Sequence, residues 1–213
     1  MTEETRIKKT HQMQVYKGVP RAWDGRIAYV ITNIASPPVL GLFVLVLASS
    51  TLASLAAWTW TGVYVVIAVL APLAFLVSLM HRGAVTDLDV QLREQRVKPL
   101  IFSLVCGGLA WLILRVGRAP RLIVLLTGLS WVQMTAAFLI TLRWKISMHC
   151  ATAAGVATAI WSFIGTPLPL LIGVPIIAWT RVRLRRHTLT QTIAGSLLGA
   201  SVFTMAFVLP IGG

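Results

Sequence analysis

Long apolar runs alternate with short polar segments along most of the chain. The apolar runs begin after a polar, basic stretch at residues 1–26, and several reach the roughly 20 residues that a helix needs to cross a bilayer. Polar segments interrupt them at residues 81–99, 143–149 and 180–191. Runs rich in β-branched residues are also expected to be helical, because an open strand edge cannot face lipid. The pattern therefore predicts an all-α, polytopic transmembrane helical bundle.

The apolar runs predict seven hydrophobic segments, of which six are principal spans if the first run is only partly inserted. The first run covers about residues 27–52, and Pro37 and Pro38 are expected to kink it or to end a short leading segment. Small residues in the fifth run favour close helix packing. The remaining runs are expected at about residues 58–80, 100–114, 121–142, 148–165, 168–183 and 192–210.

Length and composition indicate a single membrane domain. Hydrophobic residues make up 57% of the 213 residues, and the mean hydropathy is +0.82. The spans and their loops use up this length, so we expect a basic N-terminal segment at 1–26 and one transmembrane domain at 27–213. No cleavable signal peptide is expected, because the first apolar run starts too late. The two cysteines, Cys106 and Cys150, are too few for a disulfide framework or a metal knot.

The charge distribution predicts an orientation in the membrane. The formal net charge is +13, and of the 19 Lys and Arg residues all but Arg115, Arg118 and Arg121 lie in the N-terminal segment or the three polar segments. The three polar segments follow the second, fourth and sixth spans, so each lies on the same face of the membrane as the N-terminal segment. The positive-inside rule makes this face cytoplasmic. Cations beside spans meet anionic lipid headgroups, so nucleic acid is not an expected partner. We expect an integral protein of a bacterial or archaeal cell membrane.

The third polar segment carries the strongest chemical signal. It places several arginines and a histidine between two apolar runs. Arginines flanking a span commonly serve as topological anchors or lipid contacts, and that interpretation stays open for Arg183, Arg185 and Arg186. Arg181 and His187 together offer a phosphate both a permanent charge and a nitrogen that can act as nucleophile or acid. This pairing favours phosphoester chemistry.

The three polar segments carry motif-like spacings in a fixed order. In the third segment, Thr180, Arg181, His187 and Gln191 occupy the places of a Ser-Arg, five residues, His, three residues, Asp motif. In the second, the sequence Ile146-Ser147-Met148-His149 matches a Pro-Ser-Gly-His motif at its serine and histidine. The first motif, Lys, six residues, Arg-Pro, is matched by Lys98-Pro99, with Gln91 in place of the leading Lys and Arg93 or Arg96 as its candidate substitutes.

With these motifs, residues 81–200 resemble an integral membrane member of the type-2 phosphatidic acid phosphatase superfamily, which shares its site with vanadium-dependent haloperoxidases. The resemblance implies a lipid phosphatase that needs no metal or other cofactor. It would hydrolyse a phosphate or diphosphate monoester of the phosphatidic acid, phosphatidylglycerophosphate or polyprenyl diphosphate type. Its expected partners are this lipid phosphate substrate and the anionic lipids of the membrane.

The resemblance also implies roles for individual residues. His187 would attack phosphorus to give a phosphohistidine, and His149 would protonate the leaving group and later activate water. Lys145 adds charge beside the second motif, or serves as an anchor next to Trp144. The residues expected to hold the phosphate oxygens are Arg93, Arg96, Lys98, Lys145, Ser147 and Arg181.

Gln191 departs from the family pattern, which has an Asp that orients the histidine. A Gln carbonyl can still accept a hydrogen bond from an imidazole N–H, although it adds no charge. Asp87 or Asp89 could supply the carboxylate, or could cap the loop and pair with Arg93 and Arg96. The alternative function is a catalytically degenerate homologue that binds phospholipid or isoprenyl phosphate without hydrolysing it.

Two further alternatives use metals. Asp87 and Asp89 are similar to one acidic motif of intramembrane prenyltransferases, but no Asp or Glu follows Glu94, so a second carboxylate cluster for Mg²⁺ is missing. A zinc site from His81, His149, His187 and Cys150 matches no known ligand spacing. The sequence leaves the lipid tail and the oligomeric state open.

Overall fold

The computed structural model describes residues 22–85 and 93–208, and every regular element in these ranges is helical. This confirms the predicted all-α, polytopic architecture. Along the chain the helices are α2 (Trp23–Ile34), α3 (Pro37–Leu52), α4 (Leu55–Tyr64), η1 (Val65–Leu70), α5 (Ala71–His81), α6 (Arg93–Val116), α7 (Arg121–Thr141), α8 (Met148–Ile164), η2 (Pro169–Gly173), α9 (Val174–Arg183) and α10 (Leu189–Val208).

The first apolar run is broken where its prolines predict. Helix α2 ends at Ile34, Ser36 is extended, and α3 begins with Pro37. Proline has no amide hydrogen, and the first position of a helix does not use one for an intrahelical hydrogen bond. The two helices are bent by 52° and only together are long and apolar enough for one span. Exposed apolar side chains of α2 lie along one stripe: Trp23, Ile27, Val30 and Ile34.

Fewer helices than expected are long enough to cross a membrane unaided. Among the described residues four are, at Leu55–His81, Val97–Val116, Arg121–Thr141 and Leu189–Ala206, and the bent α2–α3 pair makes a fifth at most. The expected fifth span, α8, has only 17 residues and is about 26 Å long at 1.5 Å per residue. Helix α8 lies inside the bundle and contacts α3, α7, α9 and α10. Because other helices surround it, it does not need the length that would span the hydrocarbon core of the bilayer.

The polar segment expected at 81–99 is partly helical. Helix α6 begins at Arg93, so Lys98 and Pro99 lie on its first turns rather than in a loop. Arg, Glu, Gln and Lys are good helix formers, and a proline this close to the start costs the helix one backbone hydrogen bond at the Gln95 carbonyl. The expected span at 100–114 is therefore the apolar part of a longer, 24-residue helix.

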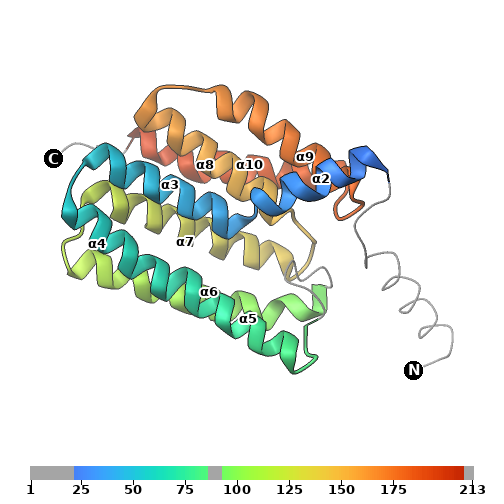
Figure 1. Ribbon diagram of the computed structural model, residues 1–213, viewed down its shortest axis with the longest axis horizontal. Helices are drawn as coiled ribbons and strands as arrows, with labels where there is room; N and C mark the ends of the chain where they lie inside the picture. Colours follow the sequence, from blue (N-terminus) through green and yellow to red (C-terminus); the bar gives the residue numbers. More distant parts are fainter. Residues whose placement is uncertain (1–21, 86–92, 209–213) are drawn as a thin grey trace.

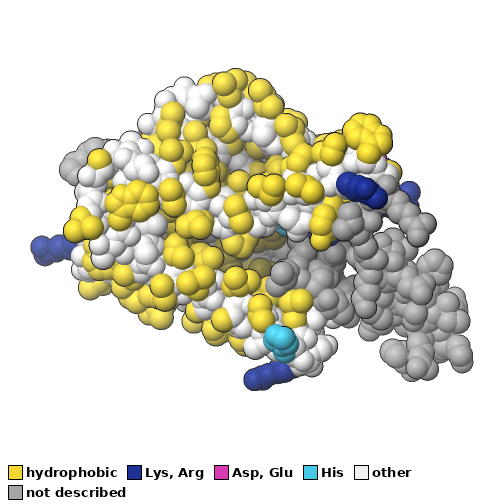
Figure 2. All heavy atoms as spheres, viewed as in Figure 1, with side chains coloured by type: hydrophobic (Ala, Val, Ile, Leu, Met, Phe, Trp, Pro, Cys, Tyr) yellow, Lys and Arg dark blue, Asp and Glu magenta, His cyan; other side chains and the backbone are white. Residues whose placement is uncertain are grey.

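All of the described motif segments lie at one end of the bundle, here called the motif end and formed by residues 82–85, 142–147 and 184–188 (Figure 1). The opposite end carries the turns at residues 53–54, 117–120 and 165–168. On the face that Figure 2 shows, hydrophobic side chains are spread over the surface between the ends, while Lys and Arg side chains appear near the ends. Exposed tryptophans flank both ends, as interfacial anchors do: Trp23, Trp144 and Trp179 at the motif end, Trp58 and Trp161 at the other.

The closest helix contact joins α8 to α10. A Cβ added at Gly195 would lie 2.5 Å from the Ser147 carbonyl oxygen, and one added at Gly199 would overlap the Ala151 carbonyl oxygen. Small residues spaced four apart allow backbones to approach in this way. The helix that carries His149 of the second motif is therefore in backbone contact with the helix that carries Gln191, the last residue of the third motif.

Candidate active site

Helix α8 presents its amino-terminal turn at the motif end. The buried hydroxyl of Ser147 caps the helix by accepting a hydrogen bond from the Cys150 amide, at 3.4 Å. His149, 6% exposed, lies in the first turn. The amide groups and dipole of a helix amino terminus favour a bound anion, so Ser147 and His149 stand where a phosphate would be stabilised.

Helix α9 ends so that the backbone joins Arg181 to His187. Arg185 takes the left-handed conformation, with φ of 54°, and its amide bonds to the Val182 carbonyl. The Arg181 carbonyl then accepts hydrogen bonds from the amides of Arg186, at 3.0 Å, and His187, at 3.3 Å. This helix stop returns the chain at once, which brings the histidine back beside the last turn of α9.

The His187 ring is held by Gln191. The Nδ1 atom of His187 lies 3.0 Å from Oε1 of Gln191, and the Thr188 amide donates to the same oxygen at 3.2 Å. Because the Thr188 N–H requires an acceptor, the carboxamide must present its oxygen here, and Nδ1 must carry the proton. In the neutral ring the lone pair is then on Nε2, the nitrogen whose chemistry is nucleophilic attack or proton acceptance.

The second and third motifs are joined directly. The Ser147 amide donates to the Gln191 carbonyl at 3.3 Å, and Gly195 packs against Ser147 as described above. Arg181 is 1% exposed and His187 is 7% exposed, so the two groups lie within the bundle rather than in open solvent.

Arg181 has a partner that sequence reasoning missed. Its Nη1 atom donates to the Thr32 hydroxyl at 2.9 Å, between side chains that are both 1% exposed. Thr32 lies on α2 and is separated from Arg181 by 149 positions. No spacing in the sequence signals a contact between segments so far apart.

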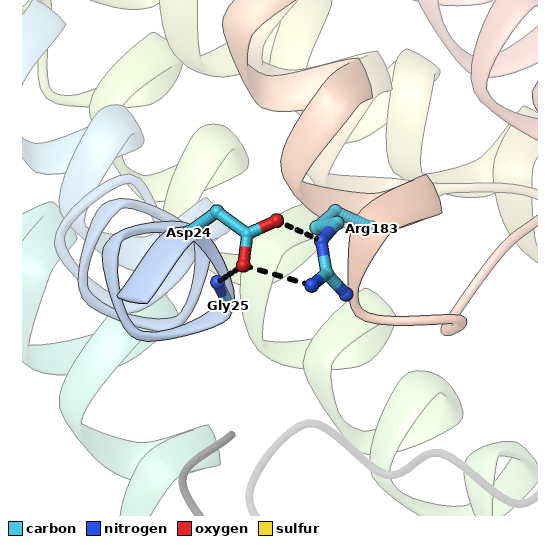
Figure 3. A network of polar contacts seen from close by, with 3 residues as sticks. All are labelled: Asp24, Gly25 and Arg183. Carbon is cyan, nitrogen blue, oxygen red and sulfur yellow. Dashed lines mark hydrogen bonds and ion pairs between the residues drawn. The ribbon is translucent and has the colours of Figure 1, made fainter. Parts of the chain in front are cut away.

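A second link between α2 and α9 lies nearby (Figure 3). The Arg183 guanidinium donates to both carboxylate oxygens of Asp24, at 2.6 Å from Nε and 2.8 Å from Nη2. The Gly25 amide donates to the same carboxylate at 2.8 Å. Asp24 precedes the apolar stretch that begins at Ile27, and the hydrogen bonds from Arg183 hold the pKa of its carboxyl group below the usual value. Arg183, open to an anchoring role from sequence, is thus an ion-pair partner.

The first motif is not joined to the others by described contacts. Lys98 is exposed on α6 and makes no hydrogen bond or ion pair with another described side chain. The side chains of Arg93 and Arg96, and the residues Asp87 and Asp89, lie outside the described part of the chain. Lys145 is half-buried in the loop before α8, and Arg185 and Arg186 follow the end of α9.

The alternative zinc site gains no support from the geometry. Within residues 22–85 and 93–208, no three His, Cys, Asp or Glu side chains are grouped so that they could hold a metal ion. His81 ends α5, and its side chain is exposed. The prenyltransferase alternative depends on Asp87 and Asp89, and both residues lie outside the described ranges of the structure.

The described site therefore combines a buried guanidinium, an oriented histidine, a second histidine and a capped helix amino terminus. This set can neutralise an oxyanion, attack an electrophile through His187 and exchange a proton through His149. It lies at the motif end, where the apolar surface meets the charged end of the bundle.

Comparison with known proteins gives one match. The model of the PAP2 superfamily matches residues 100–211, a range that contains Ser147, His149, Arg181, His187 and Gln191. Searches of the curated proteins and of the solved structures found no match. The matched range covers more than half of the chain and includes the second and third motifs, and membership supports phosphatase-type activity in general. On this match and on the helical membrane architecture, the chain belongs to the PAP2 superfamily.

Proposed function

We propose that this protein is a lipid phosphatase that hydrolyses a phosphate or diphosphate monoester through a phosphohistidine at His187. The observation that carries the proposal is the contact between the His187 ring and the Gln191 carboxamide. Gln191 Oε1 lies 3.0 Å from Nδ1 of His187, so Nε2 is the nitrogen that would act as the nucleophile. The His187 amide bonds to the carbonyl of the buried Arg181, so the backbone holds the two residues together.

The reaction would run in two balanced steps. In the first, His187 Nε2 bonds to phosphorus, the ester P–O bond breaks, and the leaving oxygen takes a proton from His149. In the second, water attacks the phosphohistidine while His149 accepts its proton, and the P–N bond breaks to release phosphate. Arg181 and the α8 amino terminus would stabilise the charge on the equatorial oxygens in both steps. The positive charges are provided by the protein, so the mechanism needs no metal.

The position of the site favours a lipid substrate. The motif end carries exposed tryptophans and basic side chains, which is the composition of a membrane–water boundary. A phosphate bound there can keep its lipid tail in the bilayer. The lipid class, phosphatidic acid, phosphatidylglycerophosphate or polyprenyl diphosphate, is the variable that the assay must scan.

The test is phosphate release by the purified protein from each of these three lipids, with and without EDTA. We expect release that survives EDTA and is blocked by vanadate, which mimics the five-coordinate transition state. His187→Ala should abolish release, while His81→Ala, an exposed histidine outside the site, should leave it unchanged. Loss of activity in EDTA with recovery in Mg²⁺, or full activity in His187→Ala, would remove the phosphohistidine mechanism.

One observation favours a second candidate, a degenerate homologue that binds a lipid phosphate without hydrolysing it. The partner of His187 is a neutral carboxamide, so it cannot stabilise the imidazolium as a carboxylate does. Binding of vanadate by a wild-type protein that releases no phosphate would establish this alternative.

A further inference from the structure

We propose that Thr32 is a positioning residue for Arg181, which makes the bent first span a working part of the phosphate site. The inference rests on the proposed function, because it assigns Arg181 to a bound phosphate. It adds an element that the matched range of residues 100–211 does not contain.

The contact is suited to directing a charged group. Arg181 Nη1 donates to Thr32 Oγ1 at 2.9 Å, and both side chains are 1% exposed. A guanidinium is planar, so fixing one of its terminal nitrogens restricts the direction in which the remaining donors point. The threonine hydroxyl is neutral and accepts this hydrogen bond without opposing the positive charge that a phosphate would meet.

The helix that carries Thr32 is itself fastened to α9. Asp24 binds Arg183 through two hydrogen bonds, at 2.6 and 2.8 Å, so α2 contacts α9 at a carboxylate as well as at the hydroxyl. Eight residues separate Asp24 from Thr32, or about 12 Å along a helix. Two arginines of α9 are therefore bound to two points of α2. Asp24 binds Arg183, and Thr32 binds Arg181.

The buried face of α2 agrees with this role. Its buried residues are Gly25, Ala28 and Thr32, and most of its large apolar side chains are exposed, while Ile31 is half-buried. Gly25 and Ala28 are small enough to let the helix lie close to α9, and Thr32 is the buried residue of α2 that carries a polar side chain. A helix whose purpose was only to fill space would gain more from a larger apolar residue at this position.

The experiment compares Thr32→Val with the wild type in vanadate binding and in phosphate release from the best lipid. Valine keeps the size and shape of threonine but removes the acceptor. We expect vanadate to bind about tenfold more weakly and KM for the lipid to rise by a similar factor, since a hydrogen bond to a charged group contributes roughly that much. The matched control is Thr127→Val, which removes a buried hydroxyl that donates within its own helix, and it should leave both values unchanged.

A second pair of variants separates positioning from packing. Thr32→Ser and Thr32→Ala both lose the methyl group, but only serine keeps the hydroxyl, so serine should restore vanadate binding and alanine should not. Wild-type vanadate binding in Thr32→Val, or equal binding in the serine and alanine variants, would overturn the inference alone. A wild-type protein that neither releases phosphate nor binds vanadate would overturn the proposed function, and the inference with it.

Discussion

At position 191 a neutral carboxamide accepts two hydrogen bonds, one from the His187 ring and one from the Thr188 amide. His187 lies in the turn just before α10, and Gln191 lies in the first turn of that helix, where its carboxamide can reach back to the ring. The geometry that orients the ring is therefore present without the negative charge that would stabilise the ring once it becomes a cation. Charge and orientation can be separated at this residue.

We expect Gln191→Glu to raise the rate of phosphate release. Glutamate has the length of glutamine, so Oε1 can stay 3.0 Å from Nδ1 while a negative charge is added. The corresponding charge in a His-assisted site is worth up to about 10⁴ in rate, and a gain of at least tenfold is expected. Steady-state phosphate release measures the gain.

Two companion variants accompany Gln191→Glu. Gln191→Asp, the residue of the family motif, should also raise the rate, whereas Gln191→Leu should lower it because Nδ1 loses its acceptor. A wild-type rate in all three variants would mean that residue 191 does not act on the nucleophile. Activity that arises only in the acidic variants would identify the natural protein as the degenerate homologue.

His149→Ala should slow release most for substrates with poor leaving groups. A lipid alcohol needs a proton as it departs, whereas p-nitrophenolate leaves readily without one, so the loss should be about 10²-fold or more for the lipid and much smaller for p-nitrophenyl phosphate. Parallel assays of the two substrates measure the difference. Equal losses would place His149 outside the proton transfer.

At the residue scale, sequence spacing predicts contacts within a motif but not between distant segments. The His187–Gln191 contact joins two residues of one motif across the start of α10, and the Ser147 cap follows from its place before an apolar run. Thr32 and Asp24 are separated from their arginines by 149 and 159 positions. Only the path of the first span brings these residues to the site, and no local pattern encodes that path.

Helices α8 and α10 form the element pair on which the spacing of the motifs depends. Gly199 faces the Ala151 backbone, and Gly155 of α8 faces Phe203 and Gln133. We expect Gly199→Ala to destabilise the protein by about 1–3 kcal/mol, because the added methyl group forces the two backbones apart. It should also lower activity by displacing His149 relative to His187.

The control for this prediction is Gly41→Ala. Gly41 lies in α3, where an added Cβ meets nothing within 4 Å, so alanine there should be neutral or stabilising by up to about 1 kcal/mol. Thermal unfolding in detergent, followed by circular dichroism, compares the two variants. Similar melting temperatures for Gly199→Ala and wild type would contradict the backbone contact.

The Asp24–Arg183 pair links α2 to α9 and predicts a pH dependence. The pKa of Asp24 is lowered by Arg183, so its contribution to stability is complete above the ordinary carboxyl pKa and is lost as pH falls through the lowered value. Both side chains are about one-third exposed, so solvent screens the pair and its contribution at neutral pH should be small. The melting temperatures of wild type and Asp24→Asn should therefore differ at pH 7 and converge in acid.

A charge reversal tests the specificity of that pair. Asp24→Arg should lower the melting temperature, and adding Arg183→Asp should recover part of the loss. Additive effects of the two substitutions would show that the ion pair does not couple the helices.

The element boundaries show which parts of the fold sequence reasoning can recover. The break at Pro37–Pro38 follows from the chemistry of proline and is confirmed by the bend of 52°. The start of α6 at Arg93 was missed, because polar helix formers ahead of an apolar run resemble a loop in a hydropathy pattern. Hydropathy marks where a helix enters lipid, not where its hydrogen bonding begins.

For the whole molecule, the predicted all-α membrane architecture is confirmed, while the number of spans is less simple than the apolar runs suggest. Short α8 is surrounded by other helices, so the bilayer thickness that fixes the length of an outer helix does not fix this one. An apolar run inside a bundle and one facing lipid have similar composition. The sequence therefore predicts the class of fold better than the depth of each helix.

The orientation of the molecule in the membrane remains a prediction, and two arginines give a matched test. Arg118 and Arg185 are both exposed and both in left-handed turns, with φ of 56° and 54°, at opposite ends of the bundle. In intact cells an impermeant thiol reagent should label Arg118→Cys and spare Arg185→Cys, because the motif end is predicted to be cytoplasmic. The reverse pattern would invert the orientation, and equal labelling of both would contradict a membrane-spanning bundle.

The hydrogen bond from the Ser147 amide to the Gln191 carbonyl allows opening of the site to be measured by hydrogen exchange. That amide can exchange with deuterium only when the amino-terminal turns of α8 and α10 separate, so its exchange rate measures how often the two halves of the site part. A bound oxyanion that requires both halves must slow this exchange, whatever its lipid tail. Isotope uptake at one backbone position can thus rank candidate ligands before any turnover is detected.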